Sequence, residues 1–178
     1  MTAQTDPSFE LRVPEGDDRE RRVCGTCGFI DYQNPRIVAG SVVLKDGKIL
    51  LCKRAIEPRK GYWTLPAGFM ELGETVEAAA AREAQEEACA SIEIDSVLAV
   101  YSVPRIGQVQ IMFRANLASE ISPGPESVEV GLFDWKDIPW SELAFPTVVW
   151  ALTHFAETRH LEHFAPFANP PGTEKITT

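Results

Sequence analysis

The most informative part of the sequence runs Gly68-Phe69-Met70-Glu71-Leu72-Gly73-Glu74 and resumes at Arg82-Glu83-Ala84-Gln85-Glu86-Glu87. The stretch 75–90 contains seven alanines and neither glycine nor proline, so it predicts a helix that Thr75 or Glu74 can cap. At about 100° per residue, Glu87 lies roughly 40° and Glu86 roughly −60° from Glu83. The sequence therefore places three carboxylates on one face of this helix.

The same helical face is apolar, because Val76, Ala79, Ala80 and Ala90 fall on it. A glutamate-rich helix is ordinarily solvated, but these acids lie where a solvated face is not expected. Like charges four residues apart repel unless a cation neutralises them, and Mg²⁺ or Mn²⁺ suits carboxylate oxygens. The pattern thus indicates a divalent-metal site.

The loop before the helix has a supporting role. Gly68 and Gly73 allow backbone conformations that are closed to other residues, so the carbonyl of Ala67 can turn toward a metal held by the helix. Arg82 can pair with Glu74 and hold the loop against the helix. The loop and the helix are expected to form one site.

These residues resemble the box of the Nudix hydrolases, G-x5-E-x7-R-E-U-x-E-E-x-G-U, where U is apolar. The match covers 23 residues, and Cys89 stands where the family has its second glycine. The matching positions are Gly68, Glu74, Arg82, Glu83, Ala84, Glu86, Glu87 and Ala90. The resemblance implies an α/β fold, an α/β/α sandwich with a mixed β-sheet, and metal-dependent hydrolysis of a nucleoside diphosphate linked to another moiety.

The resemblance also implies roles for individual residues. Glu83 and Glu87 are the expected metal ligands, with Glu86 as a further ligand or base and the Ala67 carbonyl completing the set. Glu129 resembles a late glutamate that several family members use for a second metal or as general base, and Glu126 is its rival. Either Glu86 or Glu129 can take the proton of the attacking water, and the sequence leaves that choice open.

Substrate-binding residues are expected near this site. Arg54, Arg59 and Lys60 lie in a basic loop and are candidates for a distal phosphate or ribose, although such a loop is as often simply solvated. Tyr101 is a candidate for stacking on an adenine, although such an aromatic is more often part of the core.

Local signals predict the rest of the domain. Asp46-Gly47 indicates a hairpin between strands 37–44 and 48–53. Further strands are expected at 92–102, 109–117 and 128–135, and Pro146 can open a last helix that runs to about residue 159. Residues 36–160 would form the hydrolase domain and 161–178 a tail, frayed around 169–172.

Residues 1–35 resemble the ribbon-like N-terminal segment of a Nudix subgroup that includes plant FAD and ADP-ribose pyrophosphatases. Residues 1–22 are polar and predict an extended or loosely ordered lead-in, followed by the knuckle Cys24-Gly25-Thr26-Cys27-Gly28. A zinc ribbon needs four ligands, and no second cysteine pair precedes this one. The segment therefore resembles a degenerate ribbon in which zinc at Cys24 and Cys27 is not expected.

The subgroup implies ADP-ribose or FAD as substrate, giving AMP and a phosphorylated product. The neighbouring NADH pyrophosphatases carry S-Q-P-W-P-F-P-x-S after the box, and Tyr101-Ser102-Val103-Pro104 does not match it. The alternatives are hydrolysis of NADH or of nucleoside triphosphates, and a non-catalytic nucleotide-sensing module. The family commonly forms homodimers, so a homodimer is expected.

Composition sets the outer limits. The 178 residues include 17 basic and 26 acidic side chains, a formal net charge of −9, which argues against nucleic acid or an anionic membrane as partner. No apolar run spans a bilayer and no signal peptide is apparent, which predicts a soluble, cytoplasmic protein. Residues 68–90 carry six acids and one arginine, whereas 37–67 carry six bases and two acids. The acidity is thus concentrated at the predicted metal site, beside a basic loop.

Overall fold

A computed structural model describes residues 8–173 of the chain. The chain divides into two compact units, residues 1–34 and 35–178. In the sequence, the resemblance of residues 1–35 to a ribbon-like segment was the feature that indicated a boundary at this point.

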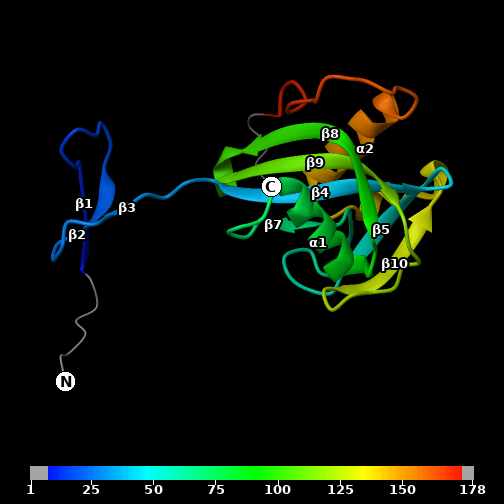
Figure 1. Ribbon diagram of the computed structural model, residues 1–178, viewed down its shortest axis with the longest axis horizontal. Helices are drawn as coiled ribbons and strands as arrows, with labels where there is room; N and C mark the ends of the chain where they lie inside the picture. The colour runs from blue at the N-terminus through cyan, green and yellow to red at the C-terminus, as the bar shows by residue number, and fades with distance from the viewer. Residues whose placement is uncertain (1–7, 174–178) are drawn as a thin grey trace. The chain divides into compact units, whose positions relative to one another are not determined.

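The larger unit is built on a seven-stranded sheet in the order β10-β5-β4-β9-β8, with β6 beside β5 and β7 beside β4 (Figure 1). Its main strands are β4 (Arg36–Lys45), β5 (Lys48–Arg54), β8 (Ile92–Val103), β9 (Gln108–Leu117) and β10 (Ser127–Phe133). The short strands are β6 (Trp63–Thr64) and β7 (Ala67–Phe69), which the sequence did not reveal. Because β4 and β9 run parallel and the other pairs antiparallel, the sheet is mixed, as expected.

The two helices cover opposite faces of this sheet. Helix α1 (Val76–Ala88) packs its alanines on the face that carries Val43 and Leu50. Helix α2 (Pro146–Thr158) packs on the face that carries Val42 and Leu51. Neighbouring residues of a strand point to opposite faces, so these pairs define two layers of core. The result is the expected α/β/α sandwich.

Local signals explain several element boundaries. The Thr75 side chain accepts a hydrogen bond from the Ala78 amide at 3.2 Å and caps α1, and Pro146 opens α2. Asp46 and Gly47 both have positive φ, as a tight hairpin turn requires. Short 3-10 helices lie at Pro104–Ile106, Trp135–Asp137 and Trp140–Glu142.

The C-terminal segment is more ordered than predicted. The Phe167 amide donates to the Leu98 carbonyl at 3.0 Å, and the Val100 amide donates to the Phe167 carbonyl at 2.9 Å. The Asn169 side chain bonds both the amide and the carbonyl of Ser102 at 2.8 Å. The expectation of fraying around 169–172 was therefore wrong at Asn169, because the backbone edge of β8 supplies partners. The last five residues of the predicted tail lie outside the described range.

The smaller unit is a three-stranded antiparallel sheet of β1 (Phe9–Arg12), β2 (Arg21–Cys24) and β3 (Ile30–Asp31). Of the two expectations for 1–22, an extended or a loosely ordered lead-in, the structure agrees with the extended one at residues 9–12, because β1 pairs with β2 along its whole length. Residues 1–7 lie outside the described range. None of the helices in residues 8–173 is long and apolar enough to cross a membrane.

Candidate active site

The acidic helix presents two buried carboxylates. Glu83 is 8% exposed and Glu87 is 4% exposed, which is an unusual degree of burial for glutamate side chains. Burial raises the pKa of Glu87 to about 8, helped by the neighbouring Glu83 charge and opposed by a backbone hydrogen bond from Ala67. Burial also raises the pKa of Glu83, against the effect of Arg82. Two desolvated acids side by side are a site that favours a cation.

The loop strand β7 closes over these acids. A Cβ atom at Gly68 would overlap the Glu83 carboxylate, so a larger residue here would displace that carboxylate. Gly124 has a similar role on the other side, because a Cβ there would overlap the backbone of Glu86, and its amide donates to the Glu87 carbonyl at 3.1 Å. The role of Gly124 was not predicted, since nothing local in Pro123-Gly124-Pro125 points to the helix.

Arg82 ties the loop to the helix. It donates to Glu74 through Nε at 3.1 Å and Nη2 at 2.9 Å, and to the Phe69 carbonyl at 2.9 Å. Its Nη1 also donates to Glu83 at 2.7 Å and to Glu86 at 3.0 Å. The pairing of Arg82 with Glu74 that the sequence suggested is therefore present. The ion pair lowers the pKa of Glu74 and raises that of Arg82.

The acidic side chains of α1 supply some of the oxygen ligands that a divalent cation needs. Glu87 Oε2 is buried and has no hydrogen-bond partner among residues 8–173. A bound cation would satisfy this oxygen. No group of three His, Cys, Asp or Glu side chains is gathered as a ready metal site within that range. Arg82 occupies oxygens of Glu83 and Glu86 instead. Mg²⁺ needs only one or two carboxylates and retains water, so Glu83 and Glu87 suffice.

Glu126 and Glu129, the two candidate late glutamates, lie in different surroundings. The charge of Glu126 raises the pKa of both Glu83 and Glu87, whereas Glu129 lies opposite Lys53 on the neighbouring strand, with 3.6 Å between its carboxylate and Lys53 Nζ. A bulge between Ser127 and Glu129 shifts the register at this point. Lys53 alternates with Cys52, which packs beneath α1, so the Lys53–Glu129 pair lies on the other face of the sheet. The structure therefore brings Glu126, not Glu129, toward the acidic helix.

The basic loop contributes one side chain to this region. Arg54 lowers the pKa of Glu87, and its Nε donates to the Pro58 carbonyl at 2.8 Å. Arg59 instead lies over the Tyr62 ring at 5.3 Å, and Lys60 is exposed. Arg54 is thus the cation of the three that faces the acids.

The prediction that Tyr101 stacks on a substrate base was wrong. Its side chain is fully buried, and its hydroxyl lies 2.7 Å from His154 Nδ1 beneath α2. Burial raises its pKa. The alternation of β8 points Tyr101 into the core, so no face of the ring is open to a ligand.

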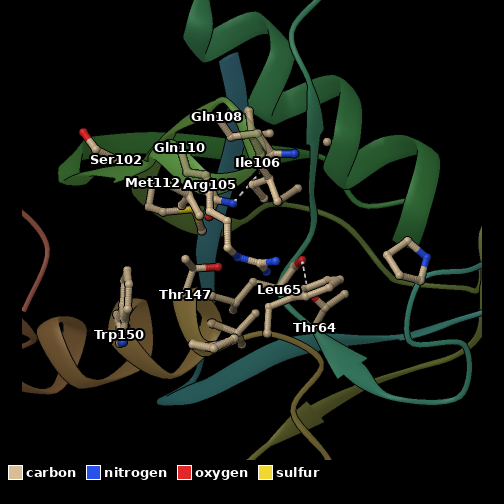
Figure 2. A pocket seen from close by; sticks show the side chains of 18 of the residues that line it. Thr64, Leu65, Ser102, Arg105, Ile106, Gln108, Gln110, Met112, Thr147 and Trp150 are labelled. Carbon is tan, nitrogen blue, oxygen red and sulfur yellow. Dashed lines mark hydrogen bonds between the residues drawn. The ribbon is translucent and has the colours of Figure 1, made fainter. Parts of the chain in front are cut away.

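A cavity of about 430 Å³ adjoins the acidic site (Figure 2). Ala67, Gly68 and Arg54 line it and also border the glutamates. Its walls come from β4, β7, β9, the connection between β8 and β9, and the start of α2. The cavity lies on the α2 face of the sheet, and Gly68 of β7, which lines it, also lies against the Glu83 carboxylate.

The N-terminal knuckle forms a separate feature. Cys24 is buried and Cys27 exposed, and hydrogen bonds from the backbone of Cys27 and Thr26 lower the pKa of Cys24. The Gly28 amide donates to the Cys24 carbonyl at 2.9 Å and closes the turn. Both thiols are free, and the described residues supply no third side-chain ligand of the kinds that bind zinc.

Comparison with known proteins identifies the family. The model of the NUDIX domain matches residues 34–152, and the model described as Nudix N-terminal matches residues 7–33. The chain therefore belongs to the Nudix family, and it is a Nudix hydrolase. The resemblance seen in the sequence is confirmed for both the fold and the enzyme class.

Individual relatives narrow the comparison. A NUDIX hydrolase of known structure from Nitrosomonas europaea is 46% identical, with a TM-score of 0.86 over 94% of this chain and 96% of that one. An ADP-ribose pyrophosphatase from Methanocaldococcus jannaschii is 39% identical over 119 residues, 64% of this chain and 69% of its own length. The NAD-capped RNA hydrolase NudC from Stutzerimonas stutzeri is 34% identical over 108 residues, 60% of this chain and 38% of its own length.

Proposed function

We propose that this chain hydrolyses the pyrophosphate bond of ADP-ribose in the presence of Mg²⁺ or Mn²⁺. Water attacks one phosphorus, the bond from that phosphorus to the bridging oxygen breaks, and AMP and ribose 5-phosphate leave. The main support is the pair of buried carboxylates, Glu83 and Glu87, together with Gly68, which lies against Glu83 and also lines a cavity of about 430 Å³. The likeness to the ADP-ribose pyrophosphatase supports the choice of substrate.

Glu83 and Glu87 would hold the metal, with the Ala67 carbonyl as a further donor. A bound divalent cation supplies charge screening at the phosphates and a lowered pKa for its water. The protein's own contribution is rigidity: Arg82 fixes Glu83 from one side, and Gly68 lets the loop lie against its carboxylate. Arg54 adds a positive charge to the lining of the cavity, where phosphate oxygens would lie.

Two carboxylates are candidates for accepting the proton of the attacking water. Glu86 is half exposed and held by Arg82, and Glu126 faces the buried pair electrostatically. Glu126 therefore takes the place that the sequence assigned first to Glu129. Rates for Glu86→Gln, Glu126→Gln and Glu129→Gln separate these roles: the base should lose about 100-fold or more, and Glu129→Gln should keep its rate within about twofold.

The test of the function is release of AMP from ADP-ribose with Mg²⁺, measured for the wild type and for Glu87→Gln. The variant should lose at least about 100-fold in kcat/KM, because it removes a charged ligand of almost unchanged shape. Glu77→Gln is the matched control, since Glu77 is an exposed glutamate in the first turn of the same helix. Full activity in Glu87→Gln would contradict the assignment.

Rates on FAD, NADH and nucleoside triphosphates test the alternatives side by side. The relatives named NAD-capped RNA hydrolase make NADH the informative comparison. A higher kcat/KM for NADH than for ADP-ribose would move the chain to that substrate. Tight binding of ADP-ribose with no turnover under any divalent metal would instead make it a nucleotide-sensing module.

We also propose a domain organisation and an oligomeric state. Residues 36–160 are proposed as the hydrolase domain and the chain as a cytoplasmic homodimer. Size-exclusion chromatography with light scattering tests the dimer, and elution at 19.7 kDa would reject it.

A further inference from the structure

Alternate residues of β9 form one wall of the cavity. Strand β9 alternates, so Gln108, Gln110 and Met112 line the cavity while Phe113 packs in the core cluster that includes α1 residues. Figure 2 shows Gln108, Gln110 and Met112 on one side of the space, and Thr147 and Trp150 of α2 on the other. A flat ligand can therefore lie between a strand and a helix here.

Two neighbouring side-chain amides of β9 offer the cavity both hydrogen-bond donors and hydrogen-bond acceptors. Gln110 Nε2 donates to Gln108 Oε1 at 3.1 Å, and both side chains are half-buried. This bond leaves Gln110 Oε1 free to accept, and it leaves both N–H groups of Gln108 Nε2 and one of Gln110 Nε2 free to donate. Neither side chain has a second hydrogen bond within the part of the chain that the structure describes.

The remaining lining combines polar side chains, among them Arg105 and Thr147, with a set of apolar residues. Leu65, Met112 and Val148 line the cavity together with Trp150. The Trp150 ring lies against the edge of Tyr101, with 5.4 Å between ring centroids and 76° between planes, and Tyr101 is itself fixed by His154. A rigid aromatic and apolar wall above a donor–acceptor pair suits the face and the edge of a heteroaromatic base.

Two lining residues connect the cavity with the acids. Gly68 lies against the Glu83 carboxylate, and Arg54 lowers the pKa of Glu87, so phosphates attached to a base in the cavity would extend toward Glu83 and Glu87. The volume of about 430 Å³ lies within the range of about 300–1,000 Å³ usual for small-molecule sites.

We infer that this cavity binds the adenine of the substrate and that Gln110 and Gln108 read its edge. The exocyclic amine of adenine donates to Gln110 Oε1, and the adjacent ring nitrogen accepts from Gln108 Nε2; in DNA recognition a single glutamine amide supplies both this acceptor and this donor. The inference rests on the proposed function for the orientation of the substrate. It goes further by naming the residues that select the base.

The test measures binding of AMP, IMP and ribose 5-phosphate to the full chain in EDTA by calorimetry. IMP carries an oxygen in place of the amine, and ribose 5-phosphate lacks the base. The wild type should bind AMP about 10-fold more tightly than IMP, and Gln110→Leu should weaken AMP about 10-fold and abolish the preference, as expected when one buried hydrogen bond is lost. Gln108→Leu should act similarly.

Gln85→Leu is the control, since Gln85 is exposed on the opposite face of α1 from Glu83 and should leave every dissociation constant unchanged. AMP should also change the tryptophan fluorescence, and Trp150→Phe should remove that change. Equal affinity for AMP and IMP in the wild type, or an unchanged preference in Gln110→Leu, would overturn the inference.

Because binding in EDTA requires no turnover, these outcomes are separate from those of the proposed function. Adenine selectivity without hydrolysis of ADP-ribose would leave the base site standing and reject the hydrolase assignment. Hydrolysis without adenine selectivity would do the reverse.

Discussion

Replacing Glu87 by glutamine should make the metal-free protein more stable while it removes activity. Burial raises the pKa of Glu87 from an ordinary value near 4.5 to about 8. Between these values the folded chain holds a proton that the unfolded chain has released. Stability therefore falls as pH rises through this window, on the order of 1 kcal/mol per pH unit for one such group. Glutamine cannot ionise, so the variant should lose this part of the slope.

The magnitude depends on pH in a definite way. Near pH 5 the folded wild type carries a neutral Glu87, so the two proteins should differ little in stability. By pH 8 the variant should be more stable by roughly 3 kcal/mol, since it avoids burying a charge beside Glu83. Saturating Mg²⁺ should reverse the order at pH 8, because only the wild type gains a ligand for the cation.

Urea unfolding in EDTA at pH 5, 6, 7 and 8 measures this difference. All four tryptophans lie between residues 63 and 150, so their fluorescence reports on the larger unit. Subtracting the two curves isolates Glu87 from other titrating groups, and Glu77→Gln should keep the wild-type slope. The reasoning is refuted if Glu87→Gln keeps the wild-type slope or is the less stable protein at pH 8 in EDTA.

Further predictions concern the supports of the site. Arg82→Lys should destabilise the protein, because lysine cannot bridge Glu74, Glu83 and the Phe69 carbonyl together. Urea unfolding should show a free energy of unfolding lower by about 2 kcal/mol or more. Cys89→Gly should add about 1 kcal/mol in the same assay, because Cys89 ends α1 with φ of 48°, a left-handed conformation that glycine adopts without cost; a destabilised variant would contradict this. Purified protein should contain well under one zinc per chain by metal analysis, and Cys24→Ser should leave unfolding of the larger unit unchanged; stoichiometric zinc lost in Cys24→Ser would show a metal site.

Much of the catalytic helix was predictable because its signals are local. The alanine-rich stretch, the Thr75 cap and the spacing of Glu83 and Glu87 all act within a few residues of one another. The same holds for the hairpin at Asp46-Gly47 and for Pro146 at the start of α2. Helical periodicity alone also placed the acids within an apolar stripe, where the structure buries them.

Other features depend on partners far away in the sequence. A single bulge in β10 turns Glu129 toward Lys53 and leaves Glu126 to face the acids, and no local pattern marks such a shift of register. Tyr101 became part of the core because β8 pairs with β9 beneath α2, and the C-terminal segment is ordered because the β8 edge had unpaired backbone groups. The sequence by itself determined which groups are the candidates for the chemistry, since helix period and capping are short-range. Only the tertiary structure decided which of them meet and which cavity they border, because strand register and packing are settled between segments distant in the chain.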